Sequence, residues 1–164
     1  MGLWETCNPM TPRPTQPVKV SFSFYPADIT ALNDLTVALR RLGAPVRRGT
    51  VLRALIALNS EAALGAAASL LHEFYVAKIG AREAEYYIGA PTVDLPPADV
   101  EKLDRVVTEL LAKQIPATRA FVVRATLRAA PKPEILAPSV KKFLAEFPRR
   151  PRTVVKKPAK HGRR

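Results

Sequence analysis

The strongest constraint on how this chain folds is an internal repeat. A shift of 71 residues places the segment 18–58 on the segment that begins at residue 89 without a gap. Identical residues at matching positions include Pro26 with Pro97, Asp28 with Asp99, Leu32 with Leu103, Leu39 with Leu110, Pro45 with Pro116, Arg48 with Arg119, and Arg53 with Arg124. Because prolines and charges recur together with leucines, the chain is expected to contain two copies of one small unit, at residues 18–58 and 89–131.

Each unit begins with a pattern typical of a strand. In residues 18–25 the apolar Val20, Phe22 and Phe24 alternate with the polar Lys19, Ser21 and Ser23. A period of two predicts a short strand with one buried face and one exposed face. The second unit repeats this pattern more weakly, with Val93 and Leu95 at the positions of Phe22 and Phe24.

Helical periodicity follows each strand. In the first unit an apolar stripe predicts a helix over about 27–42, ended by Gly43 and Pro45, and a second helix over about 47–58. A third helix is expected over about 60–79. It belongs to residues 59–88, which we interpret as a helical connector between the units.

A unit of about 40 residues cannot bury a sufficient core alone, and its strand has two unpaired edges. The simplest solution pairs two such strands antiparallel and interlocks the helices behind them. The expected fold is therefore mainly α with a short two-stranded antiparallel β-ribbon. Pairing within one chain would give a monomeric pseudo-dimer, and pairing between chains would give a homodimer. Lys19, Ser21 and Ser23 then lie on the outer face of the ribbon.

The net charge of +12 is concentrated near the C-terminus, where residues 141–164 hold ten basic residues and one acid. We interpret residues 132–164 as a basic tail, which indicates a polyanionic partner, most often nucleic acid. The alternative is a solvated tail that only aids solubility. Within this segment residues 139–147 have a helical pattern that suits either packing on the body or docking of a partner protein. Residues 1–17 contain four prolines and no periodicity, and a flexible arm is expected there.

Few residues suggest catalysis. Cys7, His72 and His161 have no metal-ligand spacing, no glycine-rich phosphate loop is present, and the polar cluster at 81–87 has no recognisable base or nucleophile partner. We therefore expect no enzyme, no cofactor and no metal site. The most apolar stretch, residues 54–71, is interrupted by polar residues, so no membrane span is expected. With one cysteine and no visible signal peptide, a cytoplasmic location is expected.

These residues resemble the ribbon-helix-helix family of DNA-binding proteins, to which Arc and MetJ belong. The resemblance covers residues 18–58 and, more loosely, about 90–130. It rests on the alternating strand, the proline at the start of the first helix (SFSFYPADI and TVDLPPADV), the leucine stripe, and a second helix that carries an arginine.

The resemblance implies roles for particular positions. The ribbon positions that read bases are Lys19, Ser21 and Ser23, and in the second unit Ala90, Thr92 and Asp94. The helix starts that clamp phosphates are Arg47, Arg48 and Gly49 in the first unit and Thr118 and Arg119 in the second. From its charge, the tail adds the phosphate-contacting candidates Lys141, Lys142, Arg149, Arg150 and Arg152.

Three residues depart from the family pattern. Arg47 stands where a Ser, Thr or Asn cap is expected, and Pro91 removes one donor from the ribbon. Asp94 suits DNA only where it accepts a hydrogen bond from a cytosine amine. We therefore expect the second strand to contribute to the fold more than to base reading.

Two units in one chain are similar to accessory proteins of plasmid conjugation and T-DNA transfer. The expected function is sequence-specific binding of double-stranded DNA through the major groove, in plasmid or T-DNA transfer, partition or repression. Other proteins of a transfer or partition complex are expected partners. The alternative is a protein-assembly module whose basic tail binds nucleic acid without sequence preference.

Overall fold

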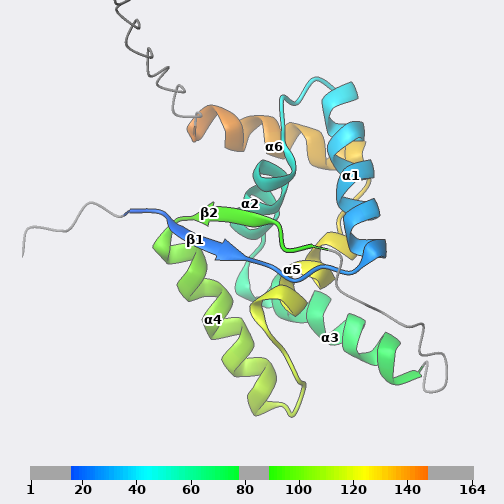
Figure 1. Ribbon diagram of the computed structural model, residues 1–164, viewed down its shortest axis with the longest axis vertical. Helices are drawn as coiled ribbons and strands as arrows, with labels where there is room; N and C mark the ends of the chain where they lie inside the picture. The colour runs from blue at the N-terminus through cyan, green and yellow to red at the C-terminus, as the bar shows by residue number, and fades with distance from the viewer. Residues whose placement is uncertain (1–15, 78–88, 148–164) are drawn as a thin grey trace, which may run out of the picture.

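The computed structural model describes residues 16–77 and 89–147. This part of the chain is mainly helical and carries a two-stranded antiparallel sheet (Figure 1). In chain order its elements are β1 (Val18–Ser21), α1 (Pro26–Arg41), α2 (Arg48–Leu58), α3 (Glu61–Ala77), β2 (Thr92–Leu95), α4 (Pro97–Ala112), α5 (Arg119–Arg128) and α6 (Pro133–Glu146). The helices predicted over about 27–42, 47–58 and 60–79 are confirmed to within two residues at each end.

The two strands of the sheet come from the two repeats of this one chain. Ser21 lies opposite Thr92, the residue at its own repeat position, and Val18 lies opposite Leu95. Beyond the regular strands, Phe24 bridges to Gly89. The pairing is therefore centred on Ser21 and Thr92. On both sides of this centre, a residue that precedes one of the two pairs with the residue that follows the other by the same number of positions.

Regular pairing ends earlier than the strand predicted for residues 18–25, and Pro91 is the physical reason. The Phe22 N–H donates to the Pro91 carbonyl at 3.1 Å. Pro91 has no N–H to donate in return, so one rung of the ladder is lost. Phe24 resumes the pattern by donating its N–H to the Gly89 carbonyl, also at 3.1 Å.

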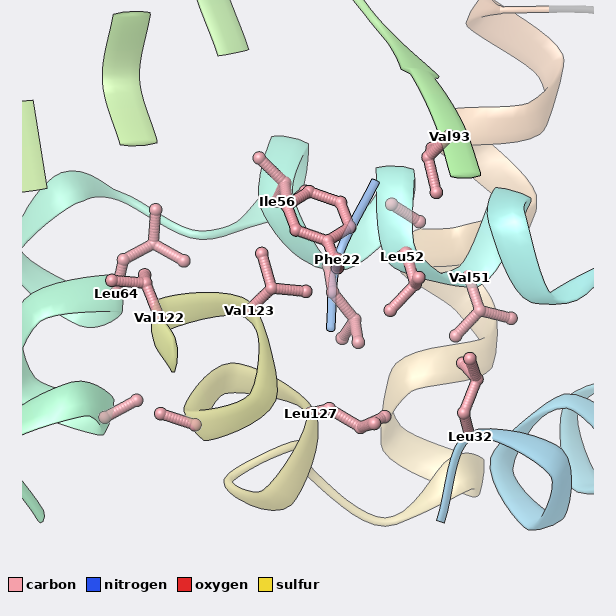
Figure 2. Close-up of a cluster of buried hydrophobic side chains, with 14 of the residues drawn as sticks. Phe22, Leu32, Val51, Leu52, Ile56, Leu64, Val93, Val122, Val123 and Leu127 are labelled. Atoms are coloured by element: carbon pink, nitrogen blue, oxygen red, sulfur yellow. The ribbon is translucent and has the colours of Figure 1, made fainter. Parts of the chain in front are cut away.

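The inner face of the ribbon forms part of the core. Phe22 and Phe24 are fully buried, and Val20 and Val93 are nearly so, as the alternation predicts. Figure 2 shows Phe22 among side chains of α2, such as Leu52 and Ile56, and of α5, such as Val123. The second helices of the two repeats thus lie behind the ribbon and cover its apolar face.

The first helices flank this centre. In Figure 1, α1 and α4 lie on opposite sides of the ribbon. Both begin at a proline, Pro26 and Pro97, whose fixed φ suits the first helical position. Both bury a leucine stripe, and Leu32 and its repeat counterpart Leu103 are fully inaccessible.

Helix α6 occupies the first part of the segment interpreted above as a basic tail. It contacts α1 and α2 and buries Leu136, Ala137, Val140 and Phe143. The helix begins at Pro133, whereas the predicted helical pattern begins at residue 139. Pro138 does not interrupt the helix: it lies inside it as an exposed residue. This part of the tail is therefore packed on the body; Phe147, by contrast, is half exposed.

Candidate nucleic-acid interface

The outer face of the ribbon is polar and exposed. Lys19, Ser21 and Ser23 are exposed as the alternation predicts, and so are Ala90, Thr92 and Asp94 from the second repeat. The hydrogen bonds at Phe22 and Phe24 mark the inward-facing residues as the hydrogen-bonded pairs of the ladder. The outward-facing residues are then the non-hydrogen-bonded pairs, whose side chains stand closest together.

The centre and one end of this face contain polar side chains from both repeats. At the centre the hydroxyls of Ser21 and Thr92 lie 3.0 Å apart and share a hydrogen bond. Two residues along, on the same face, Lys19 stands opposite Asp94 in the pairing register. A donor-bearing ammonium and an acceptor carboxylate are thus neighbours, whereas Ser23 and Ala90 at the other end carry no charge.

The start of α2 carries two exposed arginines. Arg47 is the N-cap residue and supplies no side-chain hydrogen bond to the helix. The first N–H groups of a helix have no acceptor within it, and they attract anions. Within the described residues the guanidinium groups of Arg47 and Arg48 have no hydrogen-bond or ion-pair partner. Gly49, next to them, has open space where a Cβ would stand.

The start of α5 has the same position in the second repeat but different chemistry. Thr118 caps the helix, its hydroxyl accepting a hydrogen bond from the Phe121 N–H at 3.1 Å. Arg119 is held by Asp104 of α4, with Nε donating to Oδ1 at 2.6 Å and Nη2 donating to Oδ2 at 2.7 Å. This bidentate pair lowers the pKa of Asp104 from its usual value, chiefly through the hydrogen bonds from Arg119. Sequence reasoning missed this pair.

The two repeats therefore differ in the charge that they present at matching positions. The first repeat has Lys19, Arg47 and Arg48, whereas the second has Ala90, Thr118 and Arg119. The position that matches Asp104 in the first repeat is Asn33, so Arg48 has no equivalent carboxylate.

The remaining phosphate candidates lie on or beyond α6. Lys141 and Lys142 are exposed. The Lys141 ammonium lies 3.5 Å from the point where a Cβ of Gly43 would stand, just past the end of α1, where a cation is favourable for the helix dipole. Arg149, Arg150 and Arg152 lie outside the described residues, as do the polar cluster at 81–87 and most of the predicted N-terminal arm.

A buried ionic cluster joins the two repeats and was also missed. Asp28, fully buried in the first turn of α1, accepts hydrogen bonds from Arg124 Nε at 2.6 Å and from Arg128 Nε at 2.8 Å. Arg124 Nη2 also donates to the Tyr75 hydroxyl at 2.8 Å, and its guanidinium lies 4.0 Å from the ring centre of Tyr25. The cluster holds α1, α3 and α5 together behind the ribbon. Its signal in the sequence was the recurrence of an Asp and an Arg in both repeats.

An apolar groove between α3 and α5 has a volume of about 280 Å³. Its walls include Ala67, Leu70, Phe74 and Ala129, and its only charged wall residue, Arg128, is bound to Asp28. Leu70 is 63% exposed.

Within the described residues, no three His, Cys, Asp or Glu side chains come together as a metal site. No single described helix has the length and apolar character to cross a membrane; α2 and α3 meet those criteria only together, and the chain bends by 111° between them. Comparison with known proteins finds no family model, no curated protein and no solved structure that matches this chain.

Proposed function

We propose that this protein binds double-stranded DNA through the outer face of its ribbon and discriminates between sequences in the major groove. A two-stranded ribbon fits that groove, and lysine, serine and threonine side chains reach base edges there. The observation that carries the proposal is the exposed polar face on which Lys19, Ser21 and Thr92 converge.

The same proposal treats the chain as two ribbon-helix-helix units that form a pseudo-dimer. Its support is the register, in which Ser21 pairs with its own repeat counterpart Thr92, together with the matching bounds of α1 and α4. An internal pseudo-dimer with different side chains in its two halves suits an asymmetric DNA site rather than a palindrome. The resemblance alone suggests the process, which would be plasmid or T-DNA transfer, partition or repression.

The test combines site selection with mutation. Bound sequences are selected from random duplexes, and the affinities for the selected site and for random DNA are then measured. We expect the triple variant Lys19→Ala, Ser21→Ala, Ser23→Ala to lose affinity for the selected site more than for random DNA. Lys132→Ala, which removes one charge of the basic segment at the start of α6, is the comparison for loss of charge outside the ribbon, and it is expected to weaken binding to both DNAs equally. Equal losses on both DNAs for the triple variant, or no loss, would exclude base reading by the ribbon.

The second candidate is a protein-assembly module whose basic tail binds nucleic acid without sequence preference. The exposed apolar wall of the α3–α5 groove, including Leu70 and Phe74, favours it. For this module, site selection would yield no consensus, and removal of residues 148–164 would abolish nucleic-acid binding.

A further inference from the structure

We infer that Asp104 limits the affinity of this protein for DNA by occupying Arg119, which makes the α2 side of the interface the stronger phosphate anchor. This inference rests on the proposed function. It concerns the difference between the two repeats rather than DNA binding as such.

The geometry of the pair is the first step. Both oxygens of Asp104 accept hydrogen bonds from Arg119, at 2.6 and 2.7 Å. A planar guanidinium uses the same two parallel donors to bind a phosphate. The Asp104 carboxylate therefore stands where a phosphate oxygen pair would bind, and DNA must displace it to reach those donors.

The exposure of the pair is the second step. About half of the Asp104 side chain and 40% of the Arg119 side chain are accessible to solvent. An exposed ion pair of this kind contributes little to the stability of a fold. The fold therefore does not depend on it, and its removal leaves a folded protein in which the effect on DNA can be measured.

The repeat supplies the third step. Arg48 matches Arg119, but the residue that matches Asp104 is Asn33, which has no charge. In each repeat 15 residues separate these two positions, on the first helix and at the start of the second. An aspartate at position 33 would thus have the same relation to Arg48 that Asp104 has to Arg119.

These three steps lead to a pair of reciprocal variants. Asp104→Asn frees Arg119, and Asn33→Asp is designed to occupy Arg48. One additional phosphate contact steepens the dependence of log K on log salt by about 0.9. If the contact contributes nothing at 1 M salt, this slope of about 0.9 over one decade of salt means that it raises affinity about eightfold at 0.1 M. We expect Asp104→Asn to bind a duplex about eightfold more tightly at 0.1 M salt, and Asn33→Asp to bind about eightfold more weakly.

The matched control is Glu61→Gln. Like Asp104→Asn, this variant removes one negative charge and releases an arginine, here Arg105 of α4, which lies 2.7 Å from the exposed Glu61 carboxylate. That pair joins α3 to α4 instead of lying at the start of α5. Glu61→Gln is therefore expected to leave the salt slope unchanged.

The decisive measurement is the salt slope of duplex binding by the full chain, from 0.05 to 0.3 M NaCl, for wild type, the three single variants and the double variant Asp104→Asn with Arg119→Gln. A steeper slope for Asp104→Asn alone, lost again in Asp104→Asn with Arg119→Gln, supports the inference. An unchanged or weaker affinity for Asp104→Asn, or an equal gain for Glu61→Gln, overturns it. Parallel measurement of the ribbon triple variant separates the two proposals. If that variant binds and discriminates like wild type, the proposed function itself fails.

Discussion

The hydroxyl oxygens of Ser21 and Thr92 lie 3.0 Å apart across the centre of the ribbon, although 71 residues separate them in the chain. That separation equals the period of the sequence repeat. A residue that pairs with its own counterpart marks the point about which the two halves are related. The two halves of the outer face differ on either side of this point, with Lys19 and Asp94 on one side and Ser23 and Ala90 on the other.

The inner face of the ribbon should dominate its contribution to stability. Phe22 is fully buried, so Phe22→Ala is expected to lower the free energy of unfolding by about 3–5 kcal/mol. Ser23→Ala, on the exposed face next to it, should change that free energy by less than about 0.5 kcal/mol. Denaturant unfolding at equilibrium measures both. Similar losses for the two variants would contradict the assignment of inner and outer faces.

The buried ionic cluster should respond strongly to loss of its carboxylate. Asp28→Asn leaves the guanidinium groups of Arg124 and Arg128 without their charge partner, and we expect it to cost about 3–5 kcal/mol. The control is the repeat counterpart Asp99, which is partly accessible and lies 3.6 Å from Lys102. Asp99→Asn should cost about 1 kcal/mol or less. Comparable unfolding midpoints for the two variants would show that the cluster is not a main tie between the repeats.

The pair of Asp104 and Arg119 should produce a small pH dependence of stability. Because Arg119 lowers the pKa of Asp104 in the folded state, the pair stabilises the fold above the unfolded pKa, near 3.8, and this stabilisation is lost as the pH falls through the lower folded value. Since the pair is exposed, the effect is about 0.5 kcal/mol. Titration of the Asp104 carboxyl carbon by NMR should give a midpoint below 3.8 that rises in Arg119→Gln. An identical midpoint in that variant would rule the pair out in solution.

Removal of the C-terminal basic residues should weaken DNA binding without harming the fold, provided that α6 is kept. Residues 148–164 contain eight basic residues and no acid. Truncation after Phe147 is expected to lower affinity for all duplexes and to flatten the salt dependence. Truncation after Pro138 would also delete the buried Val140 and Phe143 and should lower the unfolding midpoint. A salt slope that is unchanged after Phe147 truncation would argue against the tail as a phosphate anchor.

The repeat and its periodicities were sufficient to predict the order of elements, the bounds of most helices, and the alternation of buried and exposed residues along the ribbon. They could not predict the register, because the shift of one antiparallel strand along another depends on how the helices behind them pack. The early end of regular pairing follows from Pro91, because proline lacks the N–H that this rung of the ladder needs. The start of α6 is predicted six residues too late, at residue 139, because Pro138 suggests a break. In the structure an exposed proline is tolerated within the second turn of this helix.

The ionic pairs were harder to predict than the apolar core. Arg124 and Asp28 are 96 positions apart, and their repeat counterparts Arg53 and Asp99 do not form the same pair. Arg53 instead lies over the ring of Phe143, and its Nε, although buried, has no hydrogen-bond partner within the described residues. Helix α6 packs mainly on the first repeat's helices, α1 and α2, so identical residues meet different neighbours. Repetition in sequence predicts shared backbone positions but not shared side-chain partners.

The pairing of β1 with β2 also determines when the polar outer face of the ribbon can form. Each strand is short, and β1 has no partner until residues 92–95 have been synthesised. A contact between segments this distant forms late, because the entropy cost of closing a long loop comes before the contact can stabilise the chain. During translation, a nascent chain that stops before β2 would hold the first repeat's arginines but no ribbon. The ribbon is thus a feature that the chain acquires only after the strand segments of both repeats have been synthesised.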